Sequence, residues 1–400
     1  MLILPLIVAW TTGSFDQDAN FRSLVPAEPL PLGGYSERSG AKFTEGGQDL
    51  GVFSIRTGNT VIAAVELVTI PRSLAKAVRQ RTPGLDVVLF ATHTHCAPDS
   101  QLLNDRMTVP VPGVATFQRK WLNWYADEIA TAVKETHAVT GEWTAQSYFA
   151  PLARARRKLA VPDNRVVTIM SGGKPAFTLF GAHPTLMEPA WTKLDGDWPG
   201  AYMRRYGGLC VTGPIGDASP VPPAPGLSME RQPDLFARGL NQAILTGGIE
   251  SLPAPTLKRV PIKVPAAVAH PDFAASYKIT PEIAKIVVEK FAEPEAEITL
   301  LTFGKFVVVG VPGEPTAAVA RDIQEIGRKN GYSQVYVASH CDGWIGYLLQ
   351  PADYDRGGYE ATLSFYGREG VNAVLDAVRI GLKSAPDGSD PIGQIVNRGF

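Results

Sequence analysis

Apolar and polar positions along the chain follow strand-like and helix-like periods in turn, without a strict strand–helix–strand rhythm. Leu85–Thr92 is a continuous apolar run, as in a strand buried on both faces. Phe117–His137 instead spaces its apolar side chains three and four positions apart, which predicts an amphipathic helix. The turn pair Gly58-Asn59 between two apolar runs predicts a β-hairpin.

The same periods divide the rest of the chain into short elements. Strands are predicted at Val52–Arg56, Thr60–Thr69, Leu85–Thr92, Trp143–Phe149, Val166–Met170, Ala176–Ala182, Leu209–Thr212, Pro253–Pro265, Ile298–Phe303, Lys305–Val311 and Gln334–Ala338. Helices are predicted at Ser73–Arg81, Phe117–His137, Tyr202–Tyr206, Leu235–Leu245, Pro281–Phe291, Thr316–Lys329 and Asn372–Ile380. This mixture favours an α/β fold, with mixed β-sheets flanked by helices in one large domain.

We predict a single domain over residues 1–383 and a polar tail over 384–400, with 253–265 as the best internal boundary. The apolar start, residues 1–10, is shorter than the ~20 residues that span a bilayer. It also lacks a basic leading segment, because the first basic residue is Arg22. We therefore interpret it as a first core strand rather than a signal peptide, and expect a soluble protein in the cytoplasm rather than a secreted one, without a transmembrane segment.

Composition narrows the classes of partner. The 400 residues include 38 basic and 39 acidic side chains, a net charge of −1, and no basic stripe, so we expect no nucleic-acid binding. Three cysteines cannot form a disulfide framework. The 39 glycines and 33 prolines, with 19% charged residues, indicate many ordered loops, where functional sites tend to lie. Nothing in the sequence sets the oligomeric state.

His93 and His95 stand where the predicted strand Leu85–Thr92 ends. Residues two apart in extended backbone face the same side, so the two imidazoles converge. Neutral imidazole is a common zinc ligand, and the chain contains only six histidines. The pair therefore favours a metal site over two polar residues that merely end a strand.

Two more residues follow apolar strands in the same way. His183 ends Ala176–Ala182, and beside the first histidine pair it favours a further metal ligand over a core histidine. Glu314 precedes Pro315, which suits the first position of a helix. Glu314 therefore has two possible roles. It is either a carboxylate that caps the helix and is stabilised by the helix dipole, or a metal ligand.

Ser219 lies in the tight polar turn 216–220, GDASP, where a serine can be a nucleophile if a metal or base assists the loss of its proton. The pattern Gly-x-Ser-x-Gly is absent, which gives no support to an α/β-hydrolase nucleophile elbow. Near the carboxyl end, Tyr347 and Tyr359 stand among glycines. Loop packing explains such aromatics, and their chemistry alone does not select Tyr359 as a ligand.

Taken together, these segments resemble the amino-terminal catalytic domain of the neutral (non-lysosomal) ceramidase family. They occur in that family's order and spacing over about 270 residues. The matching segments are ATHTH at 91–95, HPT at 183–185, GDWPG at 196–200, GDASP at 216–220, VPGEPT at 311–316, and GYLLQ and GGYEAT within 346–362.

The resemblance implies a zinc-dependent amidohydrolase that cleaves an N-acyl amide bond, as in N-acylsphingosine or a related N-acyl compound, small molecule or lipid. The residues it implies as zinc ligands are His93, His183, Glu314 and Tyr359. The residues it implies as catalytic are Ser219 as a zinc-activated nucleophile, His95 as a proton shuttle or substrate contact, Tyr347 as a further donor, and Arg156 as a substrate contact for which Arg154 and Arg157 compete.

Several positions differ from the family's pattern. Residues 96–99, CAPD, replace a serine-glycine-proline-glycine run, and Val221 and Asp342 each replace an asparagine. The match ends near residue 383, so we expect the catalytic domain without the β-sandwich domain that follows it in longer members.

Other functions are weighed against this one. The alternatives are another zinc hydrolase, using metal-bound hydroxide on a non-lipid amide or ester, and a catalytically degenerate binding module. The presence of every candidate ligand together with Ser219 favours an enzyme. A barrel amidohydrolase is disfavoured, because it needs eight strand–helix repeats and the chain lacks them. A metallo-β-lactamase-like site is disfavoured too, because its motif His-x-His-x-Asp-His needs Asp and His where this chain has Ala97 and Pro98.

Overall fold

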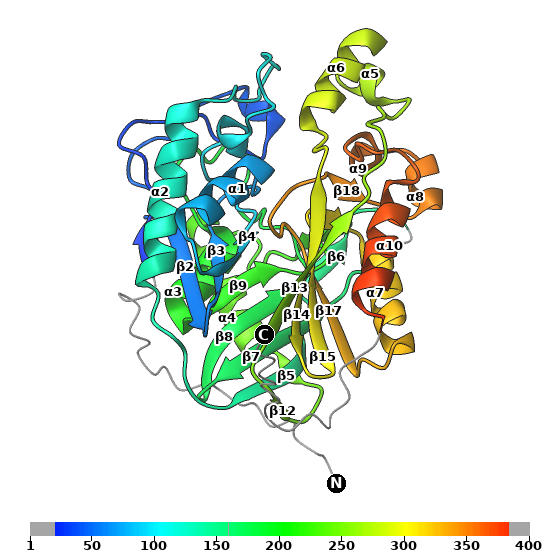
Figure 1. The fold of residues 1–400 in the computed structure, drawn as a ribbon. Coiled ribbons are helices and arrows are strands. Elements are labelled where there is room, and N and C mark those ends of the chain that lie inside the picture. The colour runs from blue at the N-terminus through cyan, green and yellow to red at the C-terminus, as the bar shows by residue number, and fades with distance from the viewer. Residues whose placement is uncertain (1–20, 159, 384–400) are drawn as a thin grey trace, which may run out of the picture.

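The computed structural model describes residues 21–158 and 160–383 (Figure 1). The strand predicted at 1–10 and the polar tail predicted at 384–400 lie outside the described residues. Over the described part the chain has an α/β fold with mixed sheets flanked by helices, as predicted. None of the helices in this part is long and apolar enough to cross a membrane.

The first sheet contains the predicted hairpin and the strand that leads to the histidine pair. Its strands, in the order β1-β2-β3-β4, are β1 (Phe21–Ser23), β2 (Gly51–Thr57), β3 (Thr60–Val65) and β4 (Asp86–Ala91). β2 and β3 pair antiparallel around Gly58, whose φ of +55° suits the turn. Helices α1 (Arg72–Arg81) and α2 (Arg119–Glu135) pack together beside this sheet (Figure 1).

The second sheet is central. Its strands are β5 (Trp143–Phe149), β7 (Arg165–Ser171), β8 (Lys174–Phe180), β9 (Leu209–Thr212), β11 (Ile244–Leu245) and β12 (Glu250–Leu252). The helices that pack beside it are α3 (Asp197–Tyr206) and α4 (Gln232–Asn241). The helix predicted at 235–245 ends early, because Ile244–Leu245 leaves the helix to pair with the edge of β5.

The third sheet carries the carboxyl-terminal part of the chain. Its strands, in order, are β13 (Thr256–Ile262), β14 (Ala296–Phe303), β15 (Phe306–Gly310) and β17 (Gln334–Ala338). Its helices are α7 (Ala317–Lys329) and α10 (Gly370–Gly381). The predicted irregular strand at 253–265 is instead a regular strand over 256–262, paired along its whole length with β14.

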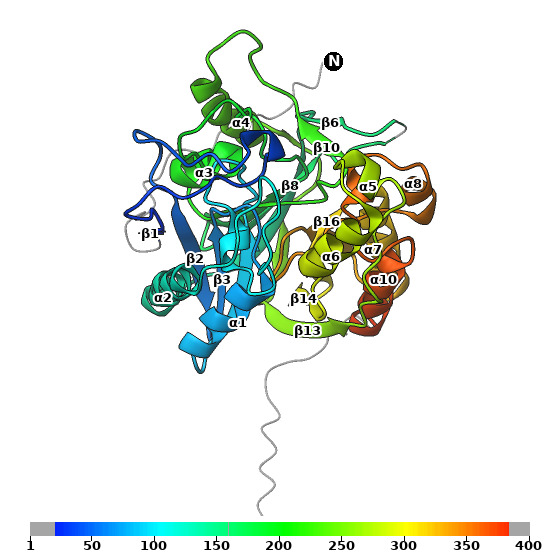
Figure 2. The same cartoon turned by 90° about the horizontal axis from the view of Figure 1, so that it is seen from above.

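Short elements complete the chain. They are α5 (Phe273–Ser276), α6 (Pro281–Phe291), α8 (Pro351–Asp355), α9 (Tyr359–Thr362), β6 (Ala153–Ala155), β10 (Ala218–Pro220), β16 (Glu314–Pro315), β18 (Tyr347–Leu348), and 3₁₀ turns at 36–38, 100–103 and 229–231. Helices α5 and α6 lie between β13 and β14 in sequence and project from one end of the molecule (Figures 1 and 2).

Buried side chains hold the three sheets together. One core contains residues from all three, for example Phe90 of β4, Phe177 of β8 and Val308 of β15. Each sheet also contains one parallel pair: β3 with β4, β8 with β9, and β15 with β17. The segments that follow β4, β8, β15 and β17 supply the candidate site residues described below.

A buried ion pair joins the first and third sheets. Arg79 of α1 lies 2.7 Å from Asp342 and 2.7 Å from Glu297 of β14, and Asp342 is fully buried. Without Arg79, Asp342 keeps only Arg259, 3.9 Å away, as an ion-pair partner among the described residues, so its buried charge is poorly compensated. We expect Arg79→Met to lower the free energy of unfolding by about 3 kcal/mol, measured by urea denaturation. Arg379→Met, which breaks an exposed pair with Asp376, is the control and should cost less than about 1 kcal/mol; equal losses would contradict the prediction.

Candidate active site

His93 is held in place by backbone on the adjacent loop. It follows β4, and its own φ is +64°, a conformation that non-glycine residues rarely adopt. Its amide donates to the carbonyl of Leu67 (3.0 Å), and its Nδ1 lies 2.7 Å from the carbonyl oxygen of Val68. A carbonyl can only accept, so Nδ1 carries the hydrogen, and the lone pair of Nε2 faces the site. This is the tautomer that a metal ligand needs.

His183 is oriented in the same way from the second sheet. It follows β8, and its amide donates to the carbonyl of Ala218 (3.0 Å), which also lies 3.1 Å from its Nδ1. Its Nε2 lies 3.1 Å from Oε2 of Glu314, and Nε2 of His93 lies 3.8 Å from the same oxygen. The structure therefore brings three of the four predicted ligands together, from three different sheets.

Glu314 occupies a short strand rather than a helix end. The predicted helix begins three residues later, at Ala317, with Thr316 as its capping residue. Glu314 lies in β16, which runs parallel to β18 and places Glu314 opposite Tyr347. Its side chain is buried, and Oε1 accepts a hydrogen bond from Nε1 of Trp344 (2.9 Å). The alternative of a helix-capping carboxylate is thus excluded by the local fold.

His340 is a site residue that the sequence analysis missed. It follows β17, is fully buried, and stacks on His93 with ring centroids 4.0 Å apart. Its Nε2 lies 3.5 Å from Oε1 of Glu314. The side-chain donors of His93, Glu314 and His340 all lie within 4.8 Å of one another, close enough to share one metal ion. The signal was present, because an apolar strand ends two residues before His340, as it does before His93.

The electrostatics of the cluster suit metal binding. Burial lowers the pKa of His93 and His183 below the ordinary histidine value, which keeps both imidazoles neutral. Burial acts to raise the pKa of Glu314, but positive charge in the cluster, at His93 first, lowers it by more, so the carboxyl group is ionised where a cation lies beside it. Neutral imidazoles around one carboxylate are a typical donor set for zinc.

Tyr347 lies in the cluster and Tyr359 lies outside it, whereas the resemblance implies Tyr359 as the ligand and Tyr347 as a further donor. The hydroxyl of Tyr347 lies 3.2 Å from Nε2 of His183, inside the cluster. Tyr359 is 51% exposed at the start of α9, and its ring centroid lies 6.0 Å from that of Tyr347. The geometry therefore favours Tyr347, not Tyr359, as the tyrosine beside a bound metal. The reason is the β16–β18 pairing, which the sequence did not predict.

Among the three candidate arginines, Arg156 reaches the cluster. Its Nη1 lies 2.9 Å from Nε2 of His183, and its amide donates to the carbonyl of Asp217 (2.8 Å). Arg157 is instead paired with Glu360 (2.8 Å), and Arg154 is exposed.

Ser219 lies on β10, directly after the carbonyl that His183 contacts. Its segment is fixed against the Glu314 segment: Gly216 donates to the carbonyl of Pro315, and a Cβ at Gly216 would lie 2.5 Å from the carbonyl oxygen of Glu314. Among the described residues, the Ser219 hydroxyl has no histidine or carboxylate within hydrogen-bond distance. The described residues therefore contain no preformed hydrogen bond between Ser219 and a histidine.

His95 faces the cavity and is held by residues that the sequence analysis also missed. Its Nε2 lies 3.2 Å from Nε2 of His93, and its ring packs against the ring of Tyr35 at 4.7 Å. Its carbonyl accepts from Arg38, a buried arginine that also donates to the carbonyl of Trp191 (2.7 Å). Burial lowers the pKa of His95, so its imidazole is neutral and able to accept a proton.

Gly34 leaves the room that His95 occupies. Its φ is +86°, and a Cβ there would lie 2.5 Å from Cγ of His95. We expect Gly34→Ala to lower both the melting temperature and any hydrolytic activity. Gly40→Ala is the matched control, because Gly40 has a φ of +80° and no heavy atom lies within 4 Å of the new methyl group. This variant should lose only the about 1–2 kcal/mol that a left-handed backbone costs an alanine. Equal effects in both variants would show that the contact with His95 is without consequence.

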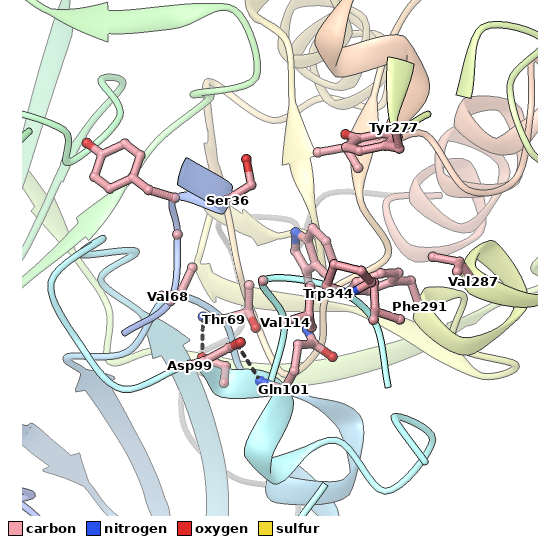
Figure 3. A pocket seen from close by; sticks show the side chains of 18 of the residues that line it. Ser36, Val68, Thr69, Asp99, Gln101, Val114, Tyr277, Val287, Phe291 and Trp344 are labelled. Carbon is pink, nitrogen blue, oxygen red and sulfur yellow. Dashed lines mark hydrogen bonds between the residues drawn. The ribbon is translucent and has the colours of Figure 1, made fainter. Parts of the chain in front are cut away.

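Two residues of the cluster, His93 and Glu314, line a cavity of about 300 Å³. One wall is apolar and comes from the α5–α6 region and the loop after β17, while Ser36, Val68, Thr69 and Asp99 lie across from it (Figure 3). The residues of the apolar wall are Phe273, Tyr277, Ile279, Ile283, Val287, Phe291, Trp344 and Leu363. His93, His95, Glu314, Tyr347 and Tyr359 line the same cavity. An apolar cavity that ends in a polar cluster suits a molecule with an apolar chain and a reactive polar group.

The fold belongs to the class of α/β folds seen in neutral ceramidases. No protein-family model matches the sequence, and no curated protein matches it. The solved neutral ceramidase from Pseudomonas aeruginosa has a TM-score of 0.69 at 16% sequence identity, covering 94% of this chain and 75% of that one. A ceramidase complexed with C2 has a TM-score of 0.66 at 15% identity, covering 94% of this chain and 77% of that one. The resemblance inferred from the motifs is thus confirmed for the fold.

Proposed function

We propose that this protein is a metal-dependent hydrolase that cleaves the amide bond of an N-acyl lipid, such as an N-acylsphingosine. The observation that carries the proposal is the meeting of His93, His183 and Glu314 beside a largely apolar cavity, which His93 and Glu314 line. The ceramidase-like fold supports it, because the relatives are named for amide hydrolysis of ceramide.

The donor chemistry fits a zinc ion. Two nitrogen lone pairs, on His93 and His183, face the ionised carboxylate of Glu314, an arrangement that a cation among them stabilises. We assign these three residues as ligands and place Tyr347, rather than Tyr359, beside them. A bound zinc ion supplies a Lewis acid that polarises the amide carbonyl and stabilises the negative charge that develops on its oxygen.

The protein's own residues supply the remaining chemistry. The Ser219 hydroxyl oxygen attacks the carbonyl carbon, the amine departs, and water later cleaves the resulting acyl ester. His95, neutral at pH 7, accepts the serine proton and passes it to the nitrogen of the leaving amine. Arg156 contacts His183 and keeps a positive charge beside the reacting group. Tyr359, a half-exposed residue that lines the cavity, donates a hydrogen bond from its hydroxyl to the polar part of the substrate.

The apolar cavity wall supports a lipid as the substrate. Phe291, Val287 and Ile283 of α6 line the cavity that His93, His95 and Glu314 also line. Val287 and Phe291 lie together on the wall with Trp344 and Tyr277 (Figure 3). Burying each CH₂ of an acyl chain contributes about 0.8 kcal/mol. Chain burial therefore favours N-acyl lipids over N-acyl compounds with short chains.

A substrate comparison tests the class of molecule. The zinc-loaded protein should release fatty acid from N-acylsphingosines faster than it hydrolyses N-acetyl amino acids or simple esters, measured as kcat/KM. The ratio of kcat/KM for N-acylsphingosines to kcat/KM for N-acetyl amino acids should fall in Val287→Asp, because this variant adds a charge to the apolar wall. Glu289→Gln, an exposed change on the same helix, is the control. Equal rates on lipid and non-lipid amides would favour the alternative of a non-lipid hydrolase.

A further inference from the structure

The ring of His340 is buried in the site, with Oε1 of Glu314 3.5 Å from its Nε2. The residue is fully buried, and neither ring nitrogen has a hydrogen-bond partner among the described residues. Buried polar groups are satisfied in nearly all folded proteins, so an unsatisfied imidazole requires an explanation such as an ion. By contrast, Nε2 of His183 already has Arg156 at 2.9 Å.

The backbone fixes His340 toward the cluster at a cost. Its φ is +54°, and the segment is clamped on both sides: its amide donates to the carbonyl of Gly313 (3.2 Å), and its carbonyl accepts from Ala91 (3.1 Å). Left-handed backbone at a non-glycine residue costs about 1–3 kcal/mol and persists where the surrounding structure enforces it, often at functional sites. His93, on which His340 stacks, has the same unusual conformation.

The separations match those of ligands that share one ion. Zinc–nitrogen and zinc–oxygen bonds of 2.0–2.2 Å in tetrahedral geometry place ligand atoms about 3.4 Å apart. Nε2 of His340 lies 3.5 Å from Oε1 of Glu314, and Nε2 of His93 lies 3.8 Å from Oε2. The two carboxylate oxygens of Glu314 thus face different imidazoles, with Oε1 turned toward His340.

We propose that His340 is a ligand of the metal ion, so that this chain binds its metal through three imidazoles and Glu314. This inference rests on the metal site of the proposed function and adds a residue to it. The four donor residues then come from the segments after β4, β8, β15 and β17, one strand end for each ligand. The added imidazole raises the nitrogen content of the donor set, which increases affinity for zinc relative to magnesium or calcium.

Metal binding tests the inference without measuring hydrolysis. His340→Phe keeps an aromatic ring to stack on His93 but has no donor atom. We expect its zinc affinity, measured by competition with a chelator, to fall at least 10-fold, and X-ray absorption to count two imidazole ligands instead of three. His137→Ala, at an exposed histidine away from the site, should leave both quantities unchanged.

A second variant gives a positive signal. His340→Cys places a thiol where the imidazole lies, and cobalt loading should then give a thiolate-to-cobalt charge-transfer band that is absent from the cobalt-loaded wild-type protein. Unchanged zinc affinity in His340→Phe together with no such band in His340→Cys would overturn the inference. A wild-type protein that shows three imidazole ligands but hydrolyses no N-acyl substrate would overturn the proposed function and leave His340 as a ligand.

Discussion

Replacing Glu314 with glutamine is expected to abolish both metal retention and hydrolysis. The substitution keeps the size of the side chain and removes the charge that the cluster surrounds. Glu314 is 2% exposed and lies 3.1 Å from His183 and 3.5 Å from His340. Loss of a residue that only orients a ligand costs 10–100-fold in metal affinity, so loss of the charged ligand itself should cost at least about 100-fold.

Metal content after dialysis and kcat/KM with a saturating metal supply are the two measurements. We expect Glu314→Gln to retain less than a tenth of the wild-type metal and to lose activity by about 10³-fold or more. Glu325→Gln on α7 is the matched control, because that side chain is exposed and pairs only with Lys329 among the described residues. Full metal content in Glu314→Gln would show that the carboxylate is not a ligand.

Replacing Ser219 with alanine should separate metal binding from catalysis. The residue lies on β10 between Ala218 and Pro220, so alanine fits the local backbone. Its hydroxyl holds none of the cluster residues, and the metal ligands should therefore stay in place. We expect wild-type metal content and a loss of about 10³-fold or more in kcat, because the attacking group is gone.

The Ser219→Ala experiment has a matched control and a result that would contradict it. Ser228→Ala, at an exposed serine later in the same loop region, should keep full activity. If Ser219→Ala hydrolyses N-acyl lipids at the wild-type rate, a water molecule is the attacking group and the serine mechanism is wrong. Trapping of an acyl ester on wild-type Ser219 by mass spectrometry would distinguish the two mechanisms directly.

Local sequence signals selected most of the residues that meet in the cluster, because those residues follow a local rule. His93, His183 and Glu314 each stand two to four residues beyond an apolar strand, and such strands are visible in one sequence. His340 follows Gln334–Ala338 by the same rule, so its sequence position carried the same signal. Applying the rule to every histidine would have found it.

Other features depend on contacts between distant segments and have no local signal. The pairing of β16 with β18 turns Glu314 away from a helix and sets it opposite Tyr347. This pairing joins two-residue strands that periodicity cannot detect, and it decides which tyrosine enters the cluster. The short helices α5, α8 and α9 were missed for the same reason, since four or five residues show no helical repeat.

One measurement tests the central claim most directly: the release of fatty acid and free amine from an N-acylsphingosine. Three samples are compared, which are the protein stripped of metal, the stripped protein reloaded with zinc, and Glu314→Gln. The account predicts equal amounts of acid and amine, no release by the stripped protein, and recovery at about one zinc ion per chain. Release that is unchanged by stripping, or no release by the zinc-loaded wild-type protein, would contradict it.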